Sequence, residues 1–235
     1  SAFSAAMQLA ALAAVVSYFW RDVRQVTTGS IDAVRRGDYN DRWFKLAVAI
    51  VLATIPIGIA GLALSSTLNA CNSPLRGLMV IGISCVVMAV LLAVAEVRAR
   101  HTREMGEMRL RDALIVGIAQ IGALIPGVSR SGSTLTTALF LNFKREEAAR
   151  FSFLLGLPAI ALAGLKELWV LLHADMPAHA WPHLLFGLVV ASVSAFFAIW
   201  GLMKFLERFS TWPFVIYRAL LGVFLIVAVS TGLLS

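Results

Sequence analysis

The chain has 235 residues, of which 60% are hydrophobic and 14% are charged. This composition, with a mean hydropathy of +0.85, excludes an ordinary soluble domain and is typical of a helical membrane protein. The net charge of +7 does not indicate nucleic-acid binding, because most basic residues flank apolar segments, as the positive-inside rule expects. The length predicts a single integral membrane domain over residues 1–235.

Six apolar segments have about the 20 residues that a membrane-spanning helix needs, and the first of them is short. The segments are 4–20, 43–64, 75–95, 151–172, 183–203 and 213–234. The connection 22–42 is polar and is expected to be a soluble linker. The pattern predicts an all-α polytopic membrane protein.

Two shorter apolar runs lie between the third and fourth spans, over residues 113–125 and 135–143. Each is too short to cross a bilayer, and runs of this length are typical of re-entrant helices. The segment between them contains Pro126, Gly127 and Arg130. We therefore predict a re-entrant pair over about 112–143, broken at Pro126-Gly127, with the second half-helix beginning near Ser131.

The positions of lysine and arginine support re-entry independently. Basic residues are concentrated after the first, third and fifth spans and after the re-entrant pair. The two other connections hold only Arg76 in one and no lysine or arginine over 175–182 in the other. Placing the basic connections in the cytoplasm gives a consistent alternation only if the pair enters and leaves on the same side.

The residues at the break fit an anion site. Arg130 can bind a phosphate through two hydrogen bonds, and Gly127 and Gly132 allow close approach of a ligand and positive φ. The second half-helix would direct its free N–H groups at the break. Hydroxyl donors are added by Ser129, Ser131, Ser133 and Thr134. The alternative is a polar turn at the cytoplasmic surface, with Arg130 as one more flanking charge.

Two further polar residues leave alternatives open. Gln120, six residues before Pro126, is either a helix–helix hydrogen-bonding group or part of the site. Arg218, about a turn inside the last span, either extends to the inner interface or is a second arginine for the same anion.

Nucleophiles and metal ligands are scarce in the predicted site. The histidines, at positions 101, 173, 179 and 183, all lie outside the re-entrant pair, which leaves the hydroxyls of Ser129, Ser131 and Ser133. Acidic residues inside the membrane are few, so this chain alone predicts no metal site. Cys71 and Cys85 predict neither a disulfide framework nor a metal site.

The motif around the break resembles that of a known family. Gly117-x-x-Gln120, followed by Ala123-Leu124-x-Pro126-Gly127-x-Ser129-Arg130-Ser131-Gly132-x-Thr134, resembles the second signature of the bacterial undecaprenyl pyrophosphate phosphatases of the bacitracin-resistance type. Similar stretches occur at 3–20, at 151–155 with Pro158, and at Pro213-Phe214-x-x-Tyr217-Arg218. The resemblance implies hydrolysis of undecaprenyl pyrophosphate to the monophosphate in the bacterial inner membrane, which recycles the lipid carrier of cell-wall synthesis and confers bacitracin resistance.

The resemblance also implies a set of site residues. By resemblance, the pyrophosphate pocket would include Ser129, Arg130, Ser131, Gly132 and Thr134. Together with the residue chemistry above, this gives Arg130, Ser129 and Ser131 as catalytic candidates, and as substrate-binding candidates Gly127, Gly132, Ser133, Thr134, Gln120 and Arg218. The expected partners are a polyprenyl pyrophosphate and the bilayer, with a homodimer among the assemblies to test and no nucleic acid. The rival interpretation is a non-hydrolytic carrier, or flippase-like protein, that binds an anionic lipid head group through the same broken helix.

One departure from the family concerns its first signature. This signature carries an acidic pair and a histidine, and it would stand before Phe3, outside this sequence. We therefore expect an inverted-repeat bundle with part of the first repeat missing. A divalent cation, Mg²⁺ or Ca²⁺, is a further expectation, with ligands that are not in this chain.

Overall fold

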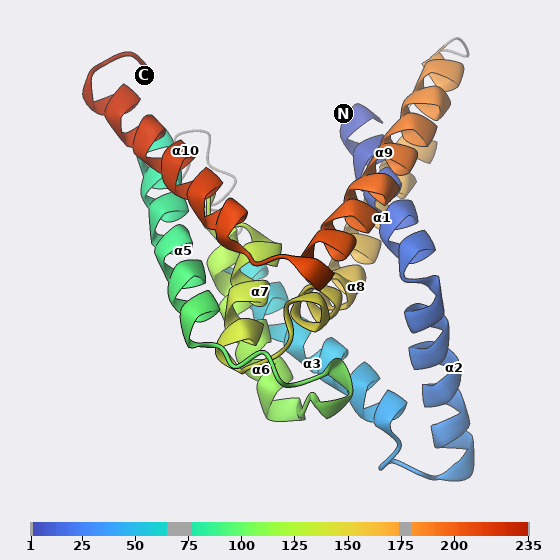
Figure 1. Ribbon diagram of the computed structural model, residues 1–235. Helices are drawn as coiled ribbons and strands as arrows, with labels where there is room; N and C mark the ends of the chain where they lie inside the picture. The colour runs from blue at the N-terminus through green and yellow to red at the C-terminus, as the bar shows by residue number, and fades with distance from the viewer. Residues whose placement is uncertain (1, 65–76, 174–179, 235) are drawn as a thin grey trace. The chain divides into compact units, whose positions relative to one another are not determined.

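The computed structural model describes residues 2–64, 77–173 and 180–234, and within these ranges the chain forms helices and no β-strand (Figure 1). Two compact units are present, and each is described by itself. One consists of Ser1–Ala47 and Phe153–Phe205, and the other of Val48–Ser152 and Leu206–Ser235. The predictions for Cys71, Arg76 and most of the connection 175–182 lie outside the described residues.

Within the described residues, four helices are long and apolar enough to cross a membrane. These are α3 (Arg42–Ala63), α5 (Leu78–Arg98), α9 (Ala180–Arg208) and α10 (Trp212–Ser230). They expose large apolar side chains such as Phe186 (72%) and Leu220 (67%), a surface that suits hydrocarbon and not water. The all-α polytopic membrane fold is therefore confirmed. The two remaining predicted spans lie in α1 (Ala2–Tyr18), which is shorter, and in α8 (Arg145–Leu172).

The first unit contains α1, α2 and most of α8 and α9. Gly164 of α8 lies beside Leu9 and Leu12 of α1, because its missing side chain lets the two helices approach. Aromatic rings join α1 to α9, with Tyr18 and Phe196 centred 5.7 Å apart. Apolar packing of this kind holds helices together when small residues let them come close.

The expected linker 22–42 is wrong over most of its length, because Trp20–Arg36 forms the helix α2. The helix is polar, with Asp22 and Ala33 as its buried residues. It ends at Gly37, which has φ of 68° and donates its N–H to the carbonyls of Ala33 and Val34. A glycine directly after two arginines is a usual helix C-terminus, and this signal could have predicted the element.

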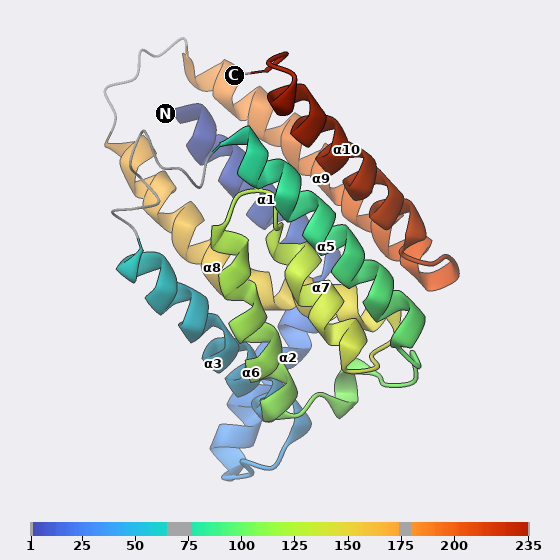
Figure 2. The same ribbon diagram turned by 90° about the vertical axis from the view of Figure 1, so that its left-hand side faces the viewer.

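The second unit is built around α5, which packs against both α10 and α7 (Figure 2). The α5–α10 contact is close because two glycines face each other. A Cβ on Gly222 would lie 2.7 Å from the Gly82 oxygen. Gly117 serves the same purpose on α6, where a Cβ would collide with the backbone of Ala53 in α3. Small residues thus bring the helices around the break into backbone contact.

The broken helix pair is present as predicted. α6 (Leu110–Ala119) continues as a 3₁₀ turn (Gln120–Leu124), the chain breaks at Pro126-Gly127, and α7 (Arg130–Phe140) packs back against α6. With 10 and 11 residues, neither helix has the length to span a bilayer.

Both ends of the pair lie together, as re-entry requires. Arg103 precedes α6 and forms an ion pair with Asp112 in its first turn. The same guanidinium donates to the Leu141 carbonyl just after α7 at 3.1 Å. The backbones also join, since Lys144 N–H donates to the Arg103 oxygen. Entry and exit therefore occur at one end of the hairpin, whereas the single membrane domain and the inverted repeat stay predictions.

Candidate active site

The break between the two half-helices takes a backbone conformation that depends on Gly127. This residue has φ of +92°, and a Cβ placed on it would lie 2.7 Å from the Ile81 oxygen of α5. Both facts restrict the position to glycine. Ser129 also has a positive φ of 66°, which the sequence did not predict for a residue with a side chain.

Ser129 is the N-cap of α7. Its hydroxyl oxygen accepts a hydrogen bond from the Gly132 N–H at 3.3 Å. An N-cap serine satisfies one of the first-turn amides, and the remaining amides point out of the helix end, where an anion is favoured. α7 begins at Arg130, one residue before the predicted start.

Gly132 differs from its prediction in one respect. It is helical, and it is not among the described residues with positive φ, so that part of the expectation is wrong. The close approach is correct, because a Cβ on Gly132 would lie 2.6 Å from Nη1 of Arg218. The glycine is therefore needed for space and not for backbone conformation.

The side chains at the end of α7 divide into an exposed and a buried set. Ser129 and Ser131 are exposed, with their hydroxyl oxygens 3.4 Å apart, and Arg130 between them is half-buried. Ser133 and Thr134 are buried, and each donates its hydroxyl to the Arg130 carbonyl, at 3.0 Å and 2.9 Å. The exposed set is the one that a head group can reach, and the buried set braces the first turn.

Gln120 is fully buried, and neither atom of its side-chain amide has a hydrogen-bond partner within the described part of the chain. The helix–helix hydrogen bond that was one of its two alternatives is therefore not formed there. Its role in substrate binding stays a prediction.

Arg218 points to the break. Its Nη2 donates to the carbonyl oxygens of Gly127 at 2.5 Å and of Val128 at 2.9 Å. Neither sequence-based alternative, extension to the interface or a direct bond to an anion, included this contact. Cys85 of α5 reaches the same place, with its sulfur 3.7 Å from the Gly127 oxygen, and the sequence gave no signal for it.

The described residues do not fit a metal centre. Over 2–64, 77–173 and 180–234, no group of three His, Cys, Asp or Glu side chains comes together. Hard divalent cations take several oxygen ligands, and within these ranges no cluster of three such side chains is present. The divalent cation stays a prediction.

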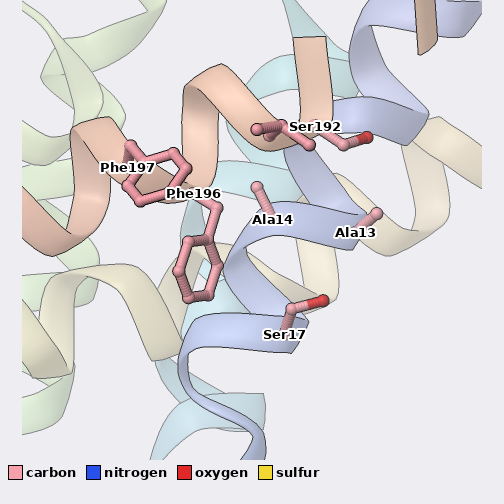
Figure 3. Close-up of a pocket in the computed structure, with 7 residues that line it drawn as sticks. Ala13, Ala14, Ser17, Ser192, Phe196 and Phe197 are labelled. Atoms are coloured by element: carbon pink, nitrogen blue, oxygen red, sulfur yellow. The ribbon is translucent and has the colours of Figure 1, made fainter. Parts of the chain in front are cut away.

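A separate cavity of about 250 Å³ lies in the first unit, between α1 and α9 (Figure 3). Its lining is mostly apolar and includes no charged side chain. The residues around it include Ala13, Ala14, Ser17, Ser192, Phe196 and Phe197. Such a lining suits hydrocarbon and offers no charge to a phosphate, so the cavity is not the anion site.

Comparison with known proteins gives a family match over almost the whole chain. Residues 1–224 match the family of bacitracin resistance protein BacA. The chain belongs to the BacA family. The resemblance that the motif around Arg130 predicted is thereby confirmed.

Several relatives match this chain along its whole length. Undecaprenyl-diphosphatase 2 of Mesorhizobium japonicum is 71% identical over 235 residues, covering 100% of this chain and 89% of the relative. An undecaprenyl-diphosphatase of Gloeobacter violaceus is 48% identical over 234 residues, covering 100% of this chain and 80% of the relative. One of Synechococcus elongatus is 45% identical over 235 residues, with coverages of 100% and 82%.

Proposed function

We propose that this chain is an undecaprenyl-diphosphatase of the bacterial inner membrane. It hydrolyses undecaprenyl diphosphate to undecaprenyl phosphate and inorganic phosphate, recycles the lipid carrier of cell-wall synthesis and confers resistance to bacitracin. The observation that carries the proposal is the α6–α7 hairpin, whose break presents Arg130 and two exposed serines at a helix N-terminus. The names of relatives up to 71% identical support it.

The reaction breaks one phosphoric anhydride bond. The oxygen of a water molecule attacks the terminal phosphorus in line, the bond to the bridging oxygen breaks, and that oxygen leaves with undecaprenyl phosphate. The water supplies the new oxygen of inorganic phosphate; one of its protons stays on the phosphate and the other passes to solvent. Negative charge grows on the bridging oxygen and is spread over the transferred group, so positioning and electrostatic stabilisation supply most of the catalysis.

The residues of the break suit these two tasks. Arg130 binds the diphosphate and offsets the developing charge, since guanidinium groups match phosphate oxygens in pairs. The first-turn N–H groups of α7 add the positive end of the helix dipole. Ser129 and Ser131 donate hydrogen bonds to the head group, and the polyprenyl tail stays in hydrocarbon. In this scheme, the substrate-binding candidates with buried side chains are Ser133, Thr134 and Gln120.

The serines are proposed as hydrogen-bond donors and not as nucleophiles. Ser129 is already the N-cap of α7, and its hydroxyl lies 3.4 Å from the Ser131 hydroxyl, which is no general base. Ser131→Ala should then lower kcat by about 10–1,000-fold, as the loss of one donor does. The double variant Ser129→Ala/Ser131→Ala should retain measurable phosphate release. Complete loss in either single variant, or a phosphoserine trapped in the native chain, would contradict the donor role.

The products formed from undecaprenyl diphosphate distinguish the phosphatase from the rival carrier. Native protein in proteoliposomes, given undecaprenyl diphosphate labelled in the terminal phosphate, should release labelled inorganic phosphate in equal amount to undecaprenyl phosphate. Transfer of intact lipid between leaflets without phosphate release would favour the carrier. A homodimer stays a prediction, to be checked by the mass of the purified protein in detergent.

A further inference from the structure

The guanidinium group of Arg218, a residue of α10, contacts the backbone of the break between α6 and α7. Its Nη2 donates to two consecutive carbonyl groups, those of Gly127 and Val128. These are the last two carbonyls before the N-cap of α7. Figure 2 shows the setting, with α10 beside α5 and α5 beside α7. One side chain from a distant helix therefore fixes two backbone acceptors of the segment that precedes Ser129.

The sign of the charges gives this contact a consequence for an anion. Carbonyl oxygens carry negative partial charge, and they would repel a diphosphate if the segment turned them toward it. The guanidinium is the strongest donor available for holding them in another direction. With the carbonyls bound to Arg218, the serine hydroxyls and the first-turn N–H groups of α7 are the groups left to face a head group.

The fit around the guanidinium is tight. Gly132 leaves only the space that Nη1 occupies, since a Cβ there would lie 2.6 Å away. The Cys85 sulfur lies 3.7 Å from the Gly127 oxygen, on the side of α5. The Nε of Arg218 is buried and has no hydrogen-bond partner within the described ranges, so the side chain gives up one bond to water to keep this position. A missing hydrogen bond at Nε is expected if the geometry of the site depends on the contact between Arg218 and the two carbonyls.

We propose that Arg218 is a positioning residue for the proposed phosphatase reaction. It holds the Gly127 and Val128 carbonyls and thereby fixes the turn 129–132 in the conformation that binds the diphosphate, without itself touching the substrate. The inference rests on the proposed function, and its test therefore includes a measurement that needs no substrate.

The kinetic test compares Arg218→Gln with Arg208→Gln, which removes the same charge from an exposed position. Arg218→Gln should lower kcat by about 100-fold, the size expected for a misplaced site, with KM within about threefold of the native value. Arg218→Lys should lie between the native chain and the glutamine variant, because an ammonium group can bind these carbonyls but lacks the planar fork. Arg208→Gln should leave both constants unchanged.

The substrate-free test uses Cys85 as a reporter, in a Cys71→Ser background. Cys85 is 6% exposed and lies against Gly127, so release of the break should open it to N-ethylmaleimide. Arg218→Gln should raise the alkylation rate about tenfold, while Arg208→Gln should leave it at the native rate.

Gly132→Ala tests the same contact by crowding the Arg218 guanidinium instead of removing it. Its new Cβ would displace Nη1, and it should lower kcat and raise Cys85 alkylation in the same direction as Arg218→Gln. In the Arg218→Gln background the shorter side chain leaves room, and Gly132→Ala should add little. This non-additivity is a readout that a general loss of stability would not produce.

Two results would overturn the inference. One is native Cys85 alkylation in Arg218→Gln, and the other is a raised KM with native kcat, which would make Arg218 a direct substrate contact. If the native chain released no phosphate, the proposed function would fail. The alkylation rates of Arg218→Gln and Gly132→Ala would then still decide whether Arg218 fixes the break.

Discussion

Ser129 contributes to the break through its backbone conformation and through its side-chain hydrogen bond. Its positive φ turns the chain into α7, and its hydroxyl then caps the helix it begins. A residue with a side chain is strained in this region, by about 1–2 kcal/mol, and strain of this kind persists where surrounding contacts hold it. Here the contacts are the bond to the Gly132 N–H and the Arg218 bonds to the two preceding carbonyls.

A buried hydroxyl pair anchors α7 to α8. The oxygens of Thr134 and Ser152 lie 2.5 Å apart and both residues are buried. Thr134→Val leaves the Ser152 hydroxyl without its partner, and it should cost about 1–3 kcal/mol in the free energy of unfolding. Thermal unfolding in detergent checks this. Thr137→Val is the matched control, because among the described residues the Thr137 hydroxyl bonds to the Ser133 carbonyl, within its own helix.

The double variant Thr134→Val/Ser152→Ala sharpens this prediction. With both hydroxyls removed, no polar group is stranded, so the double variant should be destabilised by less than the sum of the two single variants. Additive losses would show that the two hydroxyls do not interact.

An exposed ion pair near the hairpin ends predicts a weak pH dependence. Lys144 Nζ donates to Glu104 at 2.6 Å, and this hydrogen bond lowers the pKa of Glu104 and raises the pKa of Lys144. The stabilisation from Glu104 is present above its ordinary pKa of 4.5 and is lost as the pH falls through its lowered pKa. That from Lys144 is present below its ordinary pKa of 10.5 and is lost as the pH rises through its raised pKa.

The Tm difference between the native chain and Glu104→Gln reports this pair. The native chain should be slightly more stable between the two ordinary pKa values, and the difference should vanish in acid and in strong base. The effect should be small, because exposed pairs contribute little. A difference that does not change with pH would rule out the charge interaction as its cause.

At the scale of helices, the glycine contact between α5 and α10 determines where Arg218 lies. Gly222 follows Arg218 by one helical turn, on the same face of α10. A Cβ on Gly222 would lie 2.7 Å from both the Gly82 oxygen and a Val86 side-chain carbon. Gly222→Ala should therefore lower the free energy of unfolding by about 1–3 kcal/mol through overpacking, and should reduce phosphate release by displacing Arg218.

Gly58→Ala is the control for this variant. Gly58 lies in α3 with nothing within 4 Å of the position of a Cβ. It should leave activity unchanged and add up to about 1 kcal/mol of stability from helix propensity. Equal behaviour of the two variants in unfolding and in phosphate release would contradict the close-contact account.

The helices also show what periodicity and composition could predict. Segment length identified the four long apolar helices and the two short ones, since the number of residues alone decides what can cross a bilayer. The charge distribution identified the same-side ends of the hairpin, which the Arg103 contacts confirm. The helix α2 was missed because its low hydrophobicity was interpreted as a linker, although Gly37 marks a helix end.

The site was predicted as a motif and not as a geometry. Arg130, Gly127 and the exposed serines follow from residue types near one another in sequence. The contact of Arg218 with the break joins residues about 90 positions apart, and no local pattern encodes it. The same holds for Glu96, a buried carboxylate that binds Arg145 and Thr211 from two other segments.

At the scale of the whole molecule, membership of the BacA family and the geometry of the break between α6 and α7 lead to one central claim, that this chain cleaves undecaprenyl diphosphate at the N-terminus of α7. Arg130 is the residue on which the claim depends most. Arg111, exposed in the first turn of α6 on the same hairpin, provides a control with the same change of charge.

The decisive measurement is phosphate release from undecaprenyl diphosphate by this chain, compared as native protein, Arg130→Ala and Arg111→Ala. We predict that the native chain and Arg111→Ala release phosphate, and that Arg130→Ala lowers kcat/KM by at least about 100-fold. A native chain that binds the lipid through Arg130 and releases no phosphate would contradict the account, as would native activity in Arg130→Ala.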